Sequence, residues 1–181
     1  MAVWELIAVS NDLTQFVATN REDVQNEVFY TDGKPKTWAT RPQLTVFIEK
    51  RKKKPKPLGD VSFILPGSVI LNQKAYDALH QFLEKFGQFL EAECDGKVFY
   101  FYNVTKVISC IDTANSKYIG KALFKAAFDD DLAPKDAQVF KDPLKLGTGI
   151  FVSATAKTML DSLIASEKIT GIRFESENGN K

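Results

Sequence analysis

A few side chains in this chain could do chemistry, and the first of them is a single histidine, His80. A hydrolase needs a nucleophile with a general base within hydrogen-bond reach, so His80 would have to act with one of the two cysteines, Cys94 or Cys110. Neither cysteine shares a local motif with His80. Both lie in strand-like runs, where a free cysteine commonly behaves as a small apolar side chain. A small enzyme around His80 is therefore the minor alternative, and packing is the simpler interpretation.

The sequence shows no pattern for a metal or a cofactor. Zinc sites use about four Cys, His or carboxylate ligands at short spacing, and the chain contains no Cys-x-x-Cys or His-x-x-x-His. Asp129, Asp130 and Asp131 are contiguous, whereas a calcium loop places its ligands at alternate positions, so a solvated acidic loop is predicted. Gly147-Thr-Gly149 lacks the lysine of a phosphate-binding loop. We therefore expect no catalytic residues, no cofactor and no metal, and hence a protein that is not an enzyme.

The most biased stretch is Lys50-Arg-Lys-Lys-Lys-Pro-Lys-Pro57. Its cations could neutralise phosphates, so a nucleic-acid-binding module using Lys50 to Lys56 is a second alternative, with an affinity that would fall steeply with salt. Its prolines argue against a recognition helix and favour an extended, solvated chain. The sequence therefore predicts a flexible basic loop over residues 50–57.

The overall charge and the hydropathy pattern give no sign of a membrane partner, and they leave nucleic-acid binding to local patches such as the basic loop. Twenty-four Lys and Arg against 23 Asp and Glu leave a net charge of +1, which gives no overall field toward nucleic acid or an anionic membrane. No apolar run approaches the roughly 20 residues of a membrane span, and the first residues do not read as a secretion signal. We expect a cytoplasmic protein, in which a structural disulfide is not expected.

His80 and Cys94 would be positioned by a helix and a hairpin in the middle of the chain. Asn72 can cap a helix over residues 73–86, and Gly87 can end it. Its apolar face, which must be buried, consists of Ala75, Leu79, Phe82, Leu83 and Phe86.

The hairpin joins residues 89–94 to residues 97–104 through Asp95-Gly96, a dipeptide suited to a type I′ turn. A two-residue turn fixes the pairing and therefore the two faces. The expected core face carries Leu90, Ala92, Cys94, Lys97, Phe99 and Phe101. The second face carries Glu91, Glu93, Val98, Tyr100 and Tyr102.

Weaker signals complete the chain. Residues 11–26 read as a loop with at most a short helix, and residues 112–116 as a turn after a third apolar run. Strands are predicted at residues 3–9, 27–30, 44–48, 61–65, 137–141, 149–152 and 169–175, and further helices at 119–128 and 154–166. The fold class predicted is α+β: one domain over residues 1–175, with a mainly antiparallel sheet, two principal helices (73–86 and 154–166) packed against it, and a frayed tail over 176–181.

Several segments carry a family resemblance. They are Pro66 to Leu79, the hairpin, Asn103-Val-x-x-Val-Ile-Ser-Cys-Ile-Asp112, Ile150-Phe-Val-Ser153 with the helix after it, and Ile169-Thr-Gly-Ile-Arg-Phe174. Over about residues 60–175 the chain resembles a bacterial domain first catalogued as of unknown function and now grouped with the immunity proteins of polymorphic-toxin systems. The resemblance implies a protein that binds a cognate toxin and neutralises it without catalysis. A cytoplasmic location would imply a toxin with a cytosolic target.

If a toxin is bound, we expect acidic surface to bind it, because enzymes that attack nucleic acid or nucleotides tend to have a positive cleft. Two sets of residues are candidates for this contact: Asp129, Asp130 and Asp131 in the predicted loop, and Glu91 and Glu93 beside Tyr100 and Tyr102 on the second face of the hairpin. The alternative for the hairpin set is that a helix covers this face and leaves the glutamates solvated.

Overall fold

The computed structural model describes residues 2–8, 12–49 and 56–176. Within these residues the larger strands form two four-stranded antiparallel sheets. The first sheet contains, in order, β10 (Val139–Phe140), β11 (Phe151–Ser153), β1 (Val3–Ala8) and β12 (Ile172–Ser176). The second sheet contains β4 (Val61–Leu65), β5 (Ser68–Leu71), β7 (Lys97–Val104) and β6 (Gly87–Cys94).

Two small sheets and a few helices make up the rest of the described chain. The small sheets pair β2 (Phe16–Ala18) with β3 (Leu44–Val46) and β8 (Lys117–Ile119) with β9 (Ala122–Lys125). The helices are α1 (Arg21–Gln25), α2 (Gln73–Leu83) and α3 (Ala154–Glu167), with a short 3₁₀ helix, η1 (Pro143–Lys145). The predicted α+β fold class, mainly antiparallel with two principal helices, is confirmed.

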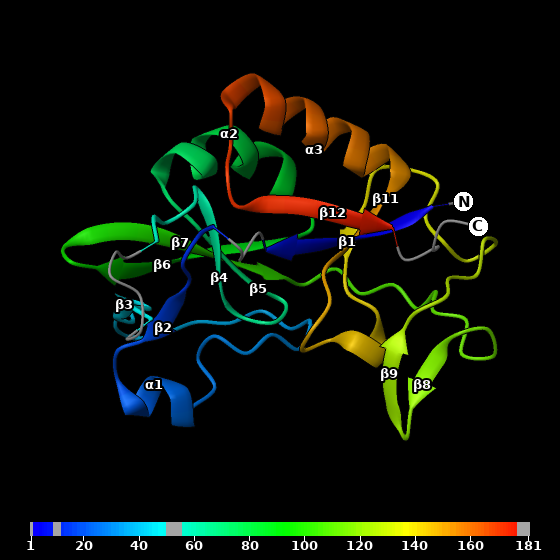
Figure 1. Ribbon diagram of the computed structural model, residues 1–181, viewed down its shortest axis with the longest axis horizontal. Coiled ribbons are helices and arrows are strands. Elements are labelled where there is room, and N and C mark those ends of the chain that lie inside the picture. The colour runs from blue at the N-terminus through cyan, green and yellow to red at the C-terminus, as the bar shows by residue number, and fades with distance from the viewer. Residues whose placement is uncertain (1, 9–11, 50–55, 177–181) are drawn as a thin grey trace.

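The two long helices cover one side of the sheets. Figure 1 shows α2 and α3 next to each other above the strands, with α1, the β2–β3 pair and the β8–β9 hairpin on the other side. Beneath the helices lies the first core cluster, which takes apolar side chains from both four-stranded sheets. Its buried residues are Leu6, Val61, Val69, Leu71, Ala75, Leu79, Phe82, Leu83, Phe86, Tyr102, Val104, Val139, Ile150, Val152, Ala156, Leu160 and Ile169.

Two further clusters lie away from these helices. The second cluster fills the opposite face of the second sheet with Phe16, Phe29, Leu44, Ile64, Ile70, Ala92, Cys94 and Phe101. The third cluster joins the first sheet to residues 110–133 and contains Val3, Cys110, Ala126, Phe128, Ala133, Phe140 and Phe151.

Helix α2 follows its sequence signals. The Asn72 side chain accepts a hydrogen bond from the backbone N–H of Ala75 (2.9 Å), which satisfies one of the unpaired donors at the helix start. The helix ends at Leu83 rather than Phe86, because the last three residues of the predicted span form a turn in which Phe86 N–H donates to the Leu83 carbonyl. Phe86 is nevertheless buried, as predicted for this face.

The β6–β7 hairpin has the predicted register. Cys94 pairs with Lys97, Ala92 with Phe99 and Leu90 with Phe101. Asp95 and Gly96 both have positive φ, 49° and 74°, as a type I′ turn requires. The predicted core face packs into the second cluster, and α2 covers part of the other face.

A single aspartate joins the two sheets at the start of β4. The Asp60 carboxylate accepts hydrogen bonds from Thr170 N–H (2.9 Å), the Thr170 hydroxyl (2.9 Å), Asn72 Nδ2 (2.9 Å) and Lys74 Nζ (3.3 Å). Next to it, Val61 N–H donates to the Thr170 carbonyl (3.0 Å). Asp60 therefore links β4 and the cap of α2 to the segment that leads into β12.

Asp60 gives the fold a defined sensitivity to acid. Burial by itself would raise the pKa of Asp60, but the hydrogen bonds from Asn72, Thr170 and Lys74 outweigh it and lower the pKa below the ordinary value of 3.8. A carboxyl group with a lowered folded-state pKa stabilises the fold above its unfolded-state pKa, and this contribution is lost as the pH falls through the folded-state pKa.

We expect Asp60→Ala to lower the free energy of unfolding by roughly 2 kcal/mol at pH 7, the scale of a hydrogen bond or two to a charged group. The difference from the parent should shrink steadily in urea titrations as the pH is lowered from 5 to about 2.5, because the parent loses the same interactions. Asp161→Ala is the matched control, since Asp161 forms an exposed ion pair with Lys157 on the surface of α3. A difference that stays constant over this pH range would contradict the role of Asp60.

Four sequence expectations need correction. The predicted helix over 119–128 is wrong: residues 117–125 form the β8–β9 hairpin, and Gly120 at its turn has φ +60°. The predicted strand over 27–30 is wrong, because these residues continue the turn after α1, with Glu27 at φ 52°.

Strands β2 and β5 were not predicted. Ser176, assigned to the frayed tail, pairs with Trp4 as the last residue of β12, and residues 177–181 lie outside the described chain.

Candidate partner-binding surfaces

The second face of the β6–β7 hairpin is divided by α2. Tyr102, a predicted partner contact, is 1% exposed, and its hydroxyl donates to the Leu83 carbonyl (2.8 Å). Burial raises the pKa of Tyr102 far above its ordinary value, so the side chain is a neutral part of the core. The expectation that Tyr102 lies on an open surface is therefore corrected: α2 covers this end of the hairpin.

Tyr100, two residues nearer the turn, stays partly exposed. Its ring stacks on Tyr76 of α2, with ring centroids 3.8 Å apart, and its hydroxyl donates to Gln73 Oε1 (2.8 Å). Burial, and then the charge of Glu91, raise the pKa of Tyr100. Tyr100 therefore forms a rigid aromatic surface with Tyr76, a residue that the sequence analysis did not select. The sequence feature that could have indicated Tyr76 is its position at the edge of the predicted apolar face of α2.

Both glutamates on this face form ion pairs with one arginine. Arg41 contacts the Glu91 carboxylate, and its Nη1 lies 3.5 Å from Glu93 Oε2. Arg41 is 50 residues from Glu91 in the chain, so no local pattern could reveal the pairs. The predicted acidic patch is therefore partly neutralised by its own chain, although Glu91 is exposed and Glu93 is partly exposed.

The loop that carries Arg41, residues 33–43, runs along β6. Trp38 Nε1 donates to the Glu91 carbonyl (3.1 Å), and Glu93 N–H donates to the Pro42 carbonyl (2.9 Å). At the other end of β6, Gln88 Oε1 accepts from Lys36 N–H (2.6 Å) and Gln88 Nε2 donates to the Lys36 carbonyl (2.9 Å). The loop is therefore held to the strand at three points.

The second predicted set divides into one structural and two surface residues. Asp129 Oδ1 accepts from the backbone N–H groups of Asp131 (2.8 Å) and Leu132 (3.4 Å), and the Asp129 carbonyl accepts from Ala133 N–H (2.8 Å). Asp129 thus holds the turn together, whereas Asp130 and Asp131 are exposed. Leu132 beside them is 59% exposed. The predicted solvated acidic loop is present, and it follows directly on the third cluster.

The structure does not bring His80 together with either cysteine. His80 Nδ1 lies 2.9 Å from the Tyr76 carbonyl, and its ring stacks on the Tyr76 ring above the second sheet. Cys94 is buried on the opposite face of that sheet, in the second cluster, and Cys110 lies in the third cluster. Burial, followed by the charges of Asp142 and Asp129, raises the pKa of Cys110 to about 12, and burial also raises the pKa of Cys94. Burial and the raised pKa thus both disfavour the reactive thiolate of each cysteine.

Two buried ionisable groups, Lys141 and Asp142, have structural partners. Lys141 Nζ donates to the carbonyls of Gly149 (3.0 Å) and Gly67 (3.3 Å), and burial lowers its pKa to about 8. The Asp142 carboxylate accepts three backbone N–H groups. Over the described ranges, no group of three His, Cys, Asp or Glu side chains is placed to hold a metal ion.

The predicted basic loop falls mostly on residues 50–55, which lie outside the described residues. At its end, the Pro57 carbonyl accepts a hydrogen bond from Thr14 N–H (2.9 Å), which anchors the chain where it enters β4. Among the helices of residues 2–8, 12–49 and 56–176, none is long and apolar enough to cross a membrane.

Comparison with protein families places the chain among immunity proteins. A family model described as "Immunity protein family (Imm11)" matches residues 8–178. This match extends the predicted resemblance, over residues 60–175, to nearly the whole chain. A search of curated proteins found no match.

Proposed function

This chain belongs to the Imm11 immunity protein family, and from that premise we propose that it binds a cognate bacterial toxin directly and neutralises it without catalysis. The family match over residues 8–178 is the observation that carries the proposal. A blocking protein needs a stable scaffold with a specific surface. The core cluster beneath α2 and α3, the two further clusters, and the separation of His80 from both cysteines support such a role.

We further propose that the protein acts in the cytoplasm, on a toxin with a cytosolic target such as nucleic acid or a nucleotide. The two cysteines support this location, since both are buried free thiols, as is usual for proteins of a reducing compartment.

The test is coexpression with the protein encoded beside this gene. We expect that neighbour to stop growth when expressed alone, growth to be restored by this chain, and the two proteins to elute as an equimolar complex on size-exclusion chromatography. A toxic neighbour that is neither bound nor neutralised would refute the proposed function.

For the contact itself, we propose that Asp130 and Asp131 steer the encounter with the toxin, supported by their exposure beside Leu132. Glu91, Glu93 and Tyr100 form a second candidate surface. Because Arg41 already pairs with both glutamates, their field should attract a positive toxin cleft less strongly. Asp129 and Tyr102 support these surfaces from within rather than contact the partner.

Reversing both charges in Asp130→Lys/Asp131→Lys should slow association with the toxin about tenfold at low salt, because steering depends on exposed charge. The double variant Glu91→Lys/Glu93→Lys should change the rate less. Association rates measured by biolayer interferometry at low and high salt would check this, with circular dichroism to confirm folding. If both folded variants associate at the parent rate, neither acidic set contacts the toxin.

A further inference from the structure

The β8–β9 hairpin exposes more apolar surface than its size accounts for. Tyr118, Ile119 and Phe124 are 44%, 66% and 65% exposed. Single exposed apolar side chains are normal on a protein surface, but three on one short hairpin are a local excess of apolar surface, and such an excess marks interaction sites. Figure 1 shows this hairpin reaching away from the two four-stranded sheets at the end opposite α1.

The local pairing explains why these side chains face solvent. Lys117 pairs with Lys125 and Tyr118 with Leu123, so Phe124 is an extra residue at a register shift. A β-bulge of this kind re-aims a side chain and is often found beside functional sites. Among the apolar residues of β9, Leu123 packs against the third cluster. Ala126, just after β9, is part of that cluster. The hairpin is therefore anchored through Leu123 within β9 and Ala126 after it, and Phe124 and Ile119 remain exposed.

The β8–β9 hairpin also carries uncompensated positive charge. Lys117 and Lys121 are exposed and Lys125 is partly exposed, and within the described chain none of the three forms a salt bridge. Like charges at Lys117 and Lys125 face each other across the ribbon, an arrangement that disfavours the free hairpin. Carboxylates of a partner placed between these cations would relieve the repulsion.

We infer that the β8–β9 hairpin inserts into an apolar groove of the toxin that has carboxylates at its rim. Ile119 and Phe124 would fill the groove, while Lys117, Lys121 and Lys125 would pair with the rim. The inference rests on the proposed function and assigns it an anchoring element. A protein groove fits better than single-stranded nucleic acid, because the latter is usually bound along a positive groove of the protein, and here the positive element is a projecting ribbon.

Two variants test the hairpin in the full-length chain. Ile119→Ser/Phe124→Ser should weaken binding of the coexpressed neighbour protein at least 30-fold, mainly through faster dissociation, as expected for apolar anchors at the centre of an interface. Lys117→Glu/Lys121→Glu should slow association about tenfold at low salt, with a smaller effect at high salt. The single variant Ile119→Ser guards against misfolding, because that side chain is largely exposed.

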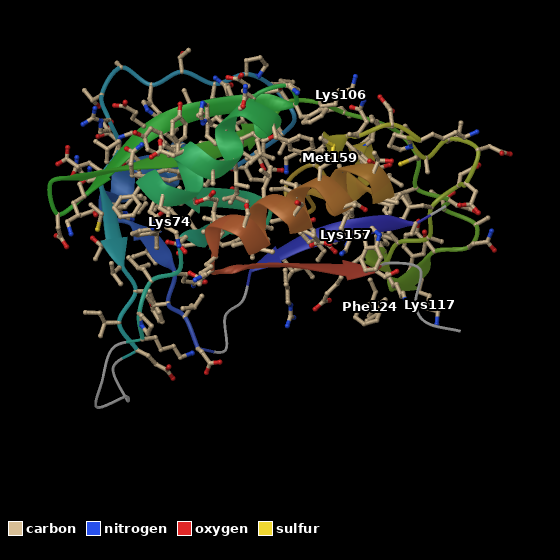
Figure 2. The ribbon with its side chains drawn as sticks, turned by 90° about the horizontal axis from the view of Figure 1, so that it is seen from above. Lys74, Lys106, Lys117, Phe124, Lys157 and Met159 are labelled. Carbon is tan, nitrogen blue, oxygen red and sulfur yellow. The ribbon has the colours of Figure 1, made fainter. Side chains whose placement is uncertain are left out.

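The matched control is Lys106→Glu/Met159→Ser. Lys106 is exposed, Met159 is 44% exposed, and Figure 2 shows both well separated from Lys117 and Phe124. We expect this control to bind like the parent. Equal binding by the parent and all folded hairpin variants would overturn the inference and leave the immunity function intact. If the parent neither binds nor neutralises the neighbour protein, the proposed function and the inference both fall.

Binding of a fluorescent single-stranded oligonucleotide tests whether the hairpin binds nucleic acid instead. Binding of the oligonucleotide that the hairpin variants abolish, together with unchanged binding of the neighbour protein, would assign the hairpin to nucleic acid and overturn the inference. No oligonucleotide binding, with the expected loss of neighbour binding, would support it.

Discussion

Gly171→Ala is expected to destabilise the protein by roughly 4 kcal/mol, a large part of the 5–15 kcal/mol that usually separates folded from unfolded domains. A Cβ atom on Gly171 would lie 1.9 Å from the Val61 carbonyl oxygen, a backbone atom that cannot rotate away. Gly171 also has φ +93°, where a non-glycine residue is strained by about 1–3 kcal/mol. To relieve this overlap, the segment before β12 must move away from β4. The hydrogen bond from Val61 N–H to the Thr170 carbonyl would then be lost.

Gly96→Ala separates the cost of the positive φ from the cost of the steric overlap. Gly96 has φ +74°, but a Cβ there would meet nothing within 4 Å. This variant therefore reports the conformational cost alone, which we expect to be about 1 kcal/mol. Urea unfolding followed by circular dichroism would compare the two variants. Equal losses would show that the contact of Gly171 with Val61 does not matter.

Asp142→Ala is expected to cost roughly 3–6 kcal/mol. Asp142 is 1% exposed, and its carboxylate accepts the backbone N–H groups of Cys110 (2.8 Å), Ile111 (2.9 Å) and Leu144 (2.9 Å). Removal of the carboxylate leaves the N–H groups of Cys110 and Ile111 unpaired in the third cluster, and that of Leu144 unpaired nearer the surface. Each buried unpaired group costs about 1–3 kcal/mol. Asp142→Asn retains one acceptor oxygen and should lose about half as much.

The rate at which the Cys110 thiol is alkylated gives a second measurement of the role of Asp142. Because its pKa is raised to about 12 and it is buried, alkylation of Cys110 at neutral pH requires local opening. Iodoacetamide labelling followed by mass spectrometry should therefore be much faster at Cys110 in Asp142→Ala than in the parent, with little change at Cys94. A parent-like rate at Cys110 would show that Asp142 does not hold this segment closed.

Elements with complete local signals were predicted correctly. Asn72 capped α2, and Asp95-Gly96 fixed the hairpin register, because capping and tight turns depend on adjacent residues. The β8–β9 hairpin was taken for a helix, since its apolar residues are compatible with a helical period and only Gly120 marks the turn. β5 was missed because its four buried residues follow Pro66-Gly67 directly and lead straight into α2.

The candidate surface was harder to predict than the fold. Tyr100 and Tyr102 share a face, as the register required, but their burial differs because α2 ends above Tyr102. The pairing of Arg41 with Glu91 and Glu93 depends on how the loop 33–43 folds back on β6, which no local pattern encodes. Periodicity gives the face of a strand, and tertiary packing decides which part of that face stays open.

The loop along β6 also limits how copies of this protein can associate. An exposed edge strand offers unpaired backbone groups on which another chain can add a strand, and this is a common route to aggregation and amyloid. Here the carbonyl of Glu91 is taken by Trp38 and the N–H of Glu93 by Pro42, so two of these groups are already satisfied within the chain. We expect Trp38→Ala, which removes one of these contacts, to make the purified protein more prone to form thioflavin-positive fibrils on concentration.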